Sequence, residues 1–423
     1  MSFLFPFLNF LQPGVLWPDL APFRPMMVAS IIGLVAGLAT KSGFPRRDAF
    51  LSSAFVWLCL FTLVQALSLY SRGLGVMLNE LLFWAMYALF VVVSLLLIRN
   101  PADLRRYVFG MMLGGMVVVF YGIYALAAKI GLAGETGRAG AYGMYQNHND
   151  YTFVIIQIIP FLYLYARQES GWKRYILRAF LAVCVAGILL SLSRGGILAL
   201  VMEFLLLVLM TMDAKRRLLL LPVVAVAGMA VIGYQWAKRA ENQQTGYTAA
   251  TAQESREELW RAAAAVVKAR PLFGVGSRRF GETARDYYSL SHNQVGKNTH
   301  NTFIEVVATS GLVGFSCFLA MLAGLWRLVR RPALGRMDPM LEATRVATLI
   351  SFYTVLFRGL LDAKNEDWSI YVLVAIGVAC KSLQRALPAA ASGVPEKSLP
   401  VGRPSERQEF ADRARLSRQI FNP

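Results

Sequence analysis

The chain has 423 residues, a mass of 46.9 kDa and a formal net charge of +18 at pH 7. Hydrophobic residues make up 56% of it, charged residues only 16%, and the mean hydropathy is +0.48. This composition excludes a soluble globular enzyme, a disordered chain and a disulfide-stabilised scaffold. Apolar residues come in runs of about twenty, the length at which a helix crosses ~30 Å of hydrocarbon. The sequence therefore predicts an all-α, polytopic membrane protein.

Twelve apolar runs predict about 12 transmembrane helices, nine within residues 1–236 and three within residues 301–386. The first run is weaker than the others and contains Pro6 and Pro13. The runs cover roughly 3–18, 26–40, 50–68, 79–98, 107–128, 151–165, 176–192, 195–212, 217–236, 301–326, 343–361 and 368–386.

The distribution of Lys and Arg predicts the orientation of these spans. Alternate loops, starting with the one after the second run, hold 18 basic residues, whereas the five short loops on the other side hold 7. Basic residues favour the cytoplasmic side, so the first set of loops and both termini are expected there. The high net charge is thus mostly a signal of topology, which argues against a nucleic-acid partner.

Two segments carry no spanning run. Residues 237–300 form a long loop on the outer side, in which we expect amphipathic helices, and loops of this length are usually functional. Residues 387–423 are basic and rich in Pro and Ser, which predicts a disordered cytoplasmic tail.

His300 is the first candidate for chemistry, because histidine suits proton transfer near neutral pH. It lies where the long loop ends and an apolar helix begins. Asn298 or Thr299 can cap that helix, which would place His300 in its first turn. The partial positive charge of a helix N-terminus suits an anionic ligand there. The alternative is a histidine that only hydrogen-bonds the loop.

Arg194 is the second candidate, in the sequence Ser193-Arg194-Gly195-Gly196 between two adjoining spans. An arginine at the hydrocarbon boundary is costly, and its guanidinium can hold a phosphate in bidentate fashion. The two glycines allow a ligand to approach the backbone at the start of the next helix. The alternative is an arginine that only extends to the membrane surface.

The long loop supplies further candidates. A helix is predicted from Gln253 to Ala269, with Arg256, Trp260 and Val267 on one face. This helix would lie over the membrane and point Arg256 inward, although Arg256 is equally consistent with a solvated charge. Arg279 and Tyr287 follow and could bind phosphate or sugar, or simply face water.

Another outer segment, Tyr145 to Asp150, is dense in hydrogen-bonding groups. Its Asn147 and His148 could hold sugar hydroxyls, or the segment could cap a helix. Glu203 lies in the middle of a span, where a proton-relay role would favour a transporter. The sequence contains no metal-binding motif, and we expect no cofactor.

Together these motifs resemble the bacterial O-antigen ligases, which share a domain with O-antigen polymerases and some O-linked oligosaccharyltransferases. The resemblance covers mainly residues 145–325 and depends on the order and spacing of several short motifs. They are Ser193 to Gly196, Arg256 with Trp260, Pro271 to Gly276, His300-Asn301 and Ser310 to Gly314.

The resemblance implies a GT-C-like membrane glycosyltransferase of the inner membrane, with its active site facing the periplasm. Such a ligase transfers a glycan from undecaprenyl diphosphate to a sugar hydroxyl of lipid A–core, without a metal and with inversion. Arg194, Arg256 and Arg279 would then bind the diphosphate, and His300 would activate the acceptor. Asn147, His148, Trp260, Tyr287 and Asn301 are expected to contact the glycan or the acceptor.

Two other enzymes and one transporter remain open from the sequence. An O-antigen polymerase uses the same donor with a second lipid-linked glycan as acceptor, and a protein oligosaccharyltransferase is the third enzyme. A transporter of lipid-linked glycans would be expected to line a path across the whole bilayer, whereas the candidate groups gather on one side. Besides donor, acceptor and membrane lipids we expect no partner, and a monomer.

Overall fold

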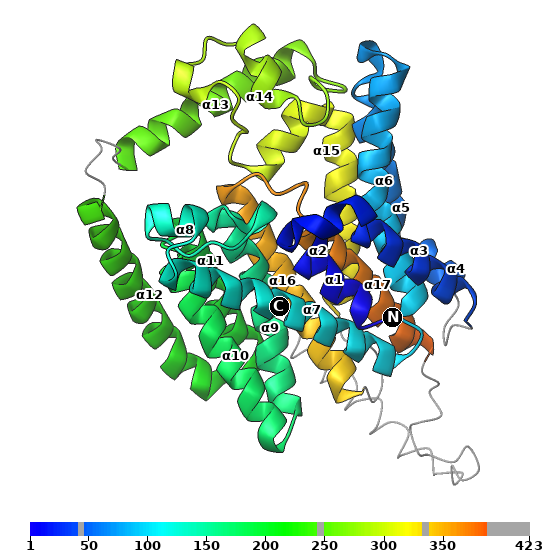
Figure 1. The fold of residues 1–423 in the computed structure, drawn as a ribbon, viewed down its shortest axis with the longest axis vertical. Coiled ribbons are helices and arrows are strands. Elements are labelled where there is room, and N and C mark those ends of the chain that lie inside the picture. Colours follow the sequence, from blue (N-terminus) through cyan, green and yellow to red (C-terminus); the bar gives the residue numbers. More distant parts are fainter. Residues whose placement is uncertain (41–45, 243–248, 332–337, 387–423) are drawn as a thin grey trace, which may run out of the picture. The chain divides into compact units, whose positions relative to one another are not determined.

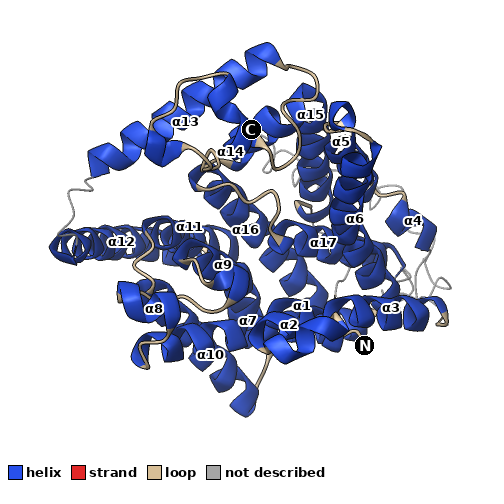
Figure 2. Cartoon of the chain, turned by 45° about the horizontal axis from the view of Figure 1, so that its top comes forward, coloured by secondary structure: helices blue, strands red, loops and turns tan. Residues whose placement is uncertain are grey.

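The computed structural model describes residues 1–40, 46–242, 249–331 and 338–386, and every regular element in these ranges is helical (Figures 1 and 2). This confirms the all-α prediction for the described part of the chain. Five 3-10 turns, η1 to η5, connect the α-helices and cover Pro18–Phe23, Tyr70–Arg72, Gly143–Tyr145, Ala284–Asp286 and His292–Gln294. The α-helices are α1 (Leu4–Leu11), α2 (Pro13–Leu16), α3 (Pro25–Leu38), α4 (Arg46–Phe50), α5 (Ser53–Leu67), α6 (Leu74–Leu97), α7 (Pro101–Ala127), α8 (Gly131–Thr136), α9 (His148–Gln168), α10 (Gly171–Leu190), α11 (Arg194–Thr211), α12 (Ala214–Asn242), α13 (Ala249–Ala269), α14 (Phe280–Thr283), α15 (Thr302–Val329), α16 (Pro339–Leu361) and α17 (Trp368–Ala386).

Eight helices in the described ranges are long and apolar enough to cross a membrane, which supports a polytopic membrane protein. They are α5, α6, α7, α11, α12, α15, α16 and α17. The predicted spans at 151–165 and 176–192 correspond to α9 and α10, of 21 and 20 residues. The total of twelve membrane-spanning helices remains a prediction.

The first two predicted spans form short helices. Gln12 has a left-handed backbone (φ 48°) that separates α1 from α2, and Pro13 opens α2. The next apolar helix, α3, has 14 residues, which is about 21 Å at 1.5 Å per residue and less than the ~30 Å of a hydrocarbon core. Instead, α1 packs on α7, and α3 packs on α6.

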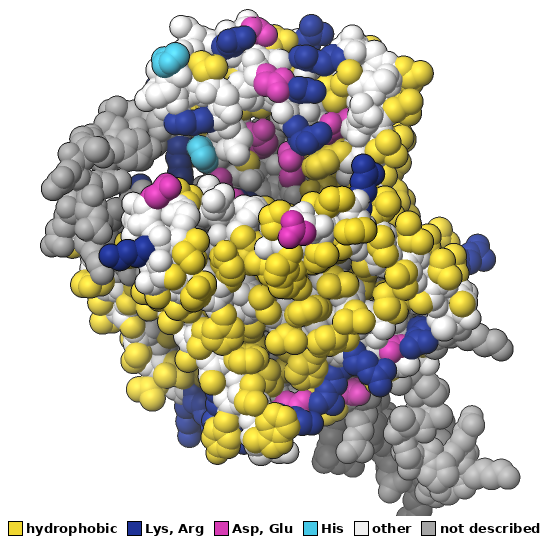
Figure 3. Space-filling model, viewed as in Figure 1, with side chains coloured by type: hydrophobic (Ala, Val, Ile, Leu, Met, Phe, Trp, Pro, Cys, Tyr) yellow, Lys and Arg dark blue, Asp and Glu magenta, His cyan; other side chains and the backbone are white. Residues whose placement is uncertain are grey.

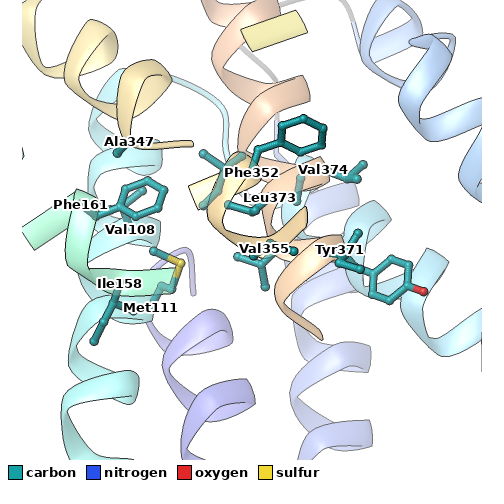
Figure 4. Packing of buried hydrophobic residues seen from close by; sticks show 14 of the residues in the cluster. Val108, Met111, Ile158, Phe161, Ala347, Phe352, Val355, Tyr371, Leu373 and Val374 are labelled. Atoms are coloured by element: carbon teal, nitrogen blue, oxygen red, sulfur yellow. The ribbon is translucent and has the colours of Figure 1, made fainter. Parts of the chain in front are cut away.

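Helix α17 lies at the centre of the packed helices. It contacts α6, α15 and α16, and side chains from all round it are buried. Figure 4 shows Tyr371, Leu373 and Val374 of α17 near Phe352 and Val355 of α16. Because this core fixes α16, it also fixes the position of the residues at the end of α16.

Helix α15 is kinked at Gly311, whose backbone is left-handed (φ 65°). The kink frees two carbonyls and two amides, and the turn at residues 271–276 hydrogen-bonds to all of them. Val275 and Gly276 N–H donate to the carbonyls of Ala308 and Thr309 at 3.1 and 2.9 Å. In return, the N–H groups of Leu312 and Val313 donate to the carbonyls of Pro271 and Leu272 at 2.8 and 3.2 Å.

A side chain at Gly311 would collide with this turn, since its Cβ would lie 2.2 Å from the Leu272 carbonyl. The two glycine motifs therefore join the long outer segment to a span, and their backbone amides are occupied by this contact. Residues 271–276 thus form a turn that packs against the kink of α15.

Helix α13 ends at Ala269, before Arg270 and Pro271, as predicted, and begins slightly earlier than expected. Its buried face consists of Leu259, Ala262, Ala263 and Val266, which pack against Phe280, Ala284 and Ala308. The predicted face of Arg256, Trp260 and Val267 therefore lies at the edge of this contact. Both ribbon views place α13 at the end of the bundle where α15 begins (Figures 1 and 2).

Side-chain types are segregated on the surface. Figure 3 shows a broad belt of hydrophobic side chains, with Lys and Arg gathered below it and with charged side chains and histidines above it, around α13 and α14. We call the end of the bundle at which α9, α11 and α15 begin the outer end, and the opposite end the inner end. The predicted tail, 387–423, lies outside the described residues.

Candidate active site

The candidate residues meet at the outer end of α16. Helix α16 contacts α9, α11 and α15 along its length, so three helix N-termini surround its C-terminal end. Arg256 of α13 reaches the same place, where its Nη2 donates to the carbonyl of Leu361 at 3.4 Å. Polar side chains from distant parts of the sequence therefore converge on residues 358–364.

His300 and Asp362 form a hydrogen-bonded pair. Nδ1 of His300 lies 3.2 Å from Oδ1 of Asp362. The His300 side chain is 36% exposed, whereas that of Asp362 is only 9% exposed. The buried carboxylate thus fixes one ring nitrogen, and Nε2 is left for a ligand.

The predicted place of His300 in the helix is wrong. Helix α15 begins at Thr302, and its N-cap is Asn301, whose Oδ1 accepts from the N–H groups of Phe303 and Ile304. His300 precedes the cap and has a left-handed backbone (φ 51°), which is uncommon for a residue with a side chain. Asn298 supports this turn by accepting from the His300 N–H at 3.1 Å.

The start of α15 is attached directly to the end of α16. Nδ2 of Asn301 donates to the carbonyl of Leu360 at 3.2 Å, and the Thr302 hydroxyl donates to that of Asp362 at 2.9 Å. Trp260 of α13 adds a third contact, with its indole N–H donating to the carbonyl of Thr299 at 2.9 Å. These bonds hold His300 against Asp362.

Asp362 belongs to a buried network of charges with Lys364 and Asp150. Lys364 Nζ lies 3.2 Å from Asp362 Oδ2 and also forms an ion pair with Asp150 of α9. Burial would raise the pKa of Asp362, but Lys364, His300 and Arg358 outweigh burial and hold its pKa below the usual range. Likewise, burial would lower the pKa of Lys364, but Asp362 and Asp150 outweigh burial and raise it. Both groups are therefore charged at neutral pH.

Arg358 is a buried cation at the same place. It is 1% exposed, and its Nη2 donates to the carbonyl of Asn149 at 3.1 Å. Its Nε has no hydrogen-bond partner among the described residues. Gly195 leaves the room for this side chain, since a Cβ at that position would lie 2.2 Å from Arg358 Nη1.

Arg194 is the first residue of α11, as predicted, and is half-buried. Ser193 caps the helix by accepting from the Gly196 N–H at 3.2 Å, and its hydroxyl donates to Asn149 Oδ1 at 2.7 Å. Within the described ranges, the side chain of Arg194 forms no hydrogen bond or ion pair. Its neighbour Gly195 touches Arg358, so Arg194 adjoins the same cluster.

The remaining predicted residues have other contacts. Arg279 forms an ion pair with Glu282 at 2.8 Å, and a hydrogen bond to Tyr287 raises the pKa of Arg270. Asn147 is the N-cap of α9, and its Oδ1 accepts from the Asn149 N–H. His148 is buried, with Nδ1 2.9 Å from the Ala139 carbonyl.

The structure thus brings His300, Arg256, Arg194, Trp260 and Asn301 to one place. The part of Arg279, Tyr287, Asn147 and His148 in binding stays a prediction. Glu203 is fully buried in α11, and neither carboxylate oxygen has a hydrogen-bond partner in the described part of the chain.

Sequence reasoning missed Arg358, Asp362, Lys364 and Asp150. Arg358 and Lys364 entered only as basic residues of an outer loop. Two signals were available. Arg358 stands at the end of an apolar run, as Arg194 does, and residues 362–367 contain only one apolar side chain, Ala363, between two apolar spans.

Residues 179–319 match a family model described as O-antigen ligase. The match covers about one third of the chain, contains Arg194, Arg256 and His300, and lies inside the region in which the sequence resembled that family. It supports an O-antigen ligase-type family assignment. No curated protein matches the chain.

Proposed function

From this family assignment, we propose that the protein is an O-antigen ligase. It transfers a glycan from undecaprenyl diphosphate to a sugar hydroxyl of lipid A–core at the periplasmic face of the inner membrane. The observation that carries the proposal is the His300–Asp362 pair beside Arg194, Arg256 and Arg358, at one end of a bundle of apolar helices.

His300 activates the acceptor in this proposal. With its Nδ1–H donated to Asp362, the ring presents Nε2 as the base. The acceptor hydroxyl oxygen forms a bond to the anomeric carbon of the donor, and its proton passes to Nε2. The bond from that carbon to the diphosphate oxygen breaks, and the electron pair leaves with the diphosphate. A single displacement of this kind inverts the anomeric carbon.

Asp362 stabilises the imidazolium that forms in this step. Lys364 and Arg358 keep the carboxylate ionised, so it accepts a hydrogen bond and does not take up the proton itself. Asp362 is therefore a positioning residue for His300.

The arginines stabilise the leaving diphosphate. Negative charge develops on the leaving group, and cations positioned before the reaction lower the barrier most effectively in a site with little water. Arg194 and Arg256 each have donors that no carboxylate occupies in the described part of the chain. Arg358 lies deeper and adds positive charge behind them. Guanidinium groups thus serve where other transferases use a metal ion.

The position of the site suits a lipid-linked donor. The cluster lies at the end of spanning helices, so the polyprenyl tail can stay in the bilayer while the diphosphate meets the arginines. The Lys and Arg side chains below the hydrophobic belt in Figure 3 support this orientation, because basic residues favour the cytoplasmic side. In the proposal the outer end faces the periplasm and both termini are cytoplasmic.

Reconstitution tests the proposal. Purified protein is mixed with undecaprenyl diphosphate-linked glycan and lipid A–core, and the products are separated on a gel. Glycan attached to the core is the expected result. Lengthened glycan on the lipid donor would instead establish a polymerase, and the absence of either product would contradict glycan transfer and favour transport.

A further inference from the structure

A polar cavity of about 370 Å³ adjoins the His300–Asp362 pair. Its volume falls in the range of small-ligand pockets. Two hydrogen bonds connect its wall to the pair, because Asn298 Oδ1 accepts from the His300 N–H and the Ala363 N–H donates to Asp362 Oδ1 at 3.0 Å. Its polar lining consists of Arg278, Glu282, Asn298, Glu305, Asn365 and Glu366.

Two polar side chains in this wall, the buried Asn365 and the half-buried Glu366, have no hydrogen-bond or ion-pair partner among the described residues. Asn365 is 5% exposed, and its side-chain amide makes no hydrogen bond with any described residue. The carboxylate of Glu366 likewise has no hydrogen-bond or ion-pair partner in the described ranges. Buried polar groups are normally paired, so an amide and a carboxylate that line a cavity indicate a polar ligand.

The cations of the wall are already neutralised. Arg278 holds Glu80 in bidentate fashion, at 3.0 and 2.9 Å, and its guanidinium stacks 3.9 Å from the Phe83 ring centre. Glu282 pairs with Arg279. Glu305 and Glu366 have no cationic partner among the described ion pairs, so the cavity has an excess of acidic groups and disfavours phosphate.

A cluster of arginines therefore lies near the end of α16 beside Asp362, and an acidic cavity adjoins the His300–Asp362 pair. A diphosphate binds at the first and is repelled by the second. Hydroxyl groups have the opposite preference, because they donate strong hydrogen bonds to carboxylates. The sugar that His300 deprotonates must lie close to the ring, and this cavity is next to the His300–Asp362 pair through Asn298 and Ala363.

We propose that this cavity binds an uncharged sugar ring of the acceptor, with hydroxyls donating to Glu366 and Glu305 and with Asn365 and Asn298 completing the contacts. This inference depends on the proposed function and names the cavity as the binding site of the acceptor, the second substrate. It also predicts selection against acceptors that are phosphorylated at the reacting sugar.

Initial rates of transfer by the purified full-length protein test the cavity, with each substrate varied in turn. For Glu366→Gln the KM for lipid A–core should rise about tenfold, the loss of one charge-assisted hydrogen bond, while the KM for the donor stays within twofold. Asn365→Ala should have a smaller effect in the same direction. Asp286→Asn, an exposed carboxyl of the same outer segment outside the cavity, should leave both constants unchanged.

Unchanged acceptor KM in both cavity variants, or a change confined to the donor KM, would overturn the proposal. A thermal melting curve for each variant separates these results from unfolding. Direct binding distinguishes a failure of this inference from a failure of the proposed function. Dephosphorylated core oligosaccharide should give saturation-transfer NMR signals with the wild type that weaken in Glu366→Gln, whether or not transfer occurs. Binding that is equal in both proteins would contradict the cavity alone.

Discussion

Two arginines near Asp362 at the outer end of the helix bundle differ in their hydrogen-bond partners from two arginines at the inner end. At the inner end, Arg99 pairs with Asp103 at 2.7 Å, and Arg345 pairs with Glu342 at 2.5 Å. At the outer end, Arg256 and Arg358 donate to backbone carbonyls. The carboxylates nearest to these two arginines, Asp362 and Asp150, are engaged by His300 and Lys364 instead.

This difference separates two uses of the same residue type. An arginine neutralised by a carboxylate anchors a helix at the membrane surface and has little charge left for a ligand. An arginine bonded only to a carbonyl keeps its charge, and holding it near hydrocarbon is costly unless an anion binds. The comparison therefore assigns anion binding to the arginines near Asp362, and substitutions there and at the inner end should have unequal effects.

Removing the base should have the largest effect. His300→Ala is expected to slow transfer by about 10³-fold or more, because no other described residue offers a proton acceptor beside Asp362. Initial rates at saturating donor and acceptor measure this effect, with melting temperature as the control for folding. Wild-type activity in this variant would remove His300 from the mechanism and leave the outer end as a binding site only.

The arginine comparison is tested by matched substitutions at the two ends. Arg194→Lys should lower the transfer rate by about 10–100-fold, because an ammonium group cannot form the bidentate contact to phosphate. Arg99→Lys, at the inner end, should leave the rate within about twofold. Equal effects at both ends would show that arginine serves the same purpose throughout the protein.

Part of this site was predictable from the sequence, for identifiable reasons. Hydropathy located the spans. Arg194 was identified because an arginine at the hydrocarbon boundary is costly in free energy and because two glycines follow it. Arg358 also stands at the end of an apolar run, but it was counted only as a basic residue of a loop. Nothing in the sequence indicates that it packs against Gly195. The pairing of His300 with Asp362 joins residues 62 positions apart and needed the folded chain.

The helix ends were less predictable than the helices. Several residues between Asn298 and Thr302 can cap a helix, and only the contact of Asn301 with the Leu360 carbonyl decides among them. The kink at Gly311 likewise depends on a contact with residues distant in the sequence. A glycine inside an apolar run is compatible with a straight helix, and the turn at 271–276 that satisfies the kink is distant in sequence.

The outer end also contains Glu366, a carboxylate without a cationic partner, and its titration sharpens the comparison. Burial raises the pKa of Glu366 to about 7; Arg278 opposes this rise, and Glu305 and Glu80 add to it. Glu366 is therefore mostly neutral at pH 6 and mostly charged at pH 8. Since a charged carboxylate accepts hydroxyl hydrogen bonds more strongly, the acceptor KM should fall about threefold between these pH values. The same measurement on Glu366→Gln should show no such fall; an equal fall in both proteins would assign the titration to another group.

The smallest expected effect is that of metal removal. If the outer arginines provide the positive charge that stabilises the diphosphate, the reaction does not need a divalent ion, and chelators should leave the transfer rate unchanged. The measurement is the transfer rate in EDTA, compared with the rate after Mg²⁺ or Mn²⁺ is restored in excess. A loss of activity in EDTA that either ion reverses would mean that the arginines share the diphosphate with a metal. In that case the arginines near Asp362 would bind a diphosphate that also carries a metal ion. Arg194→Lys should then lower the transfer rate by less than the about 10–100-fold expected from loss of the bidentate contact.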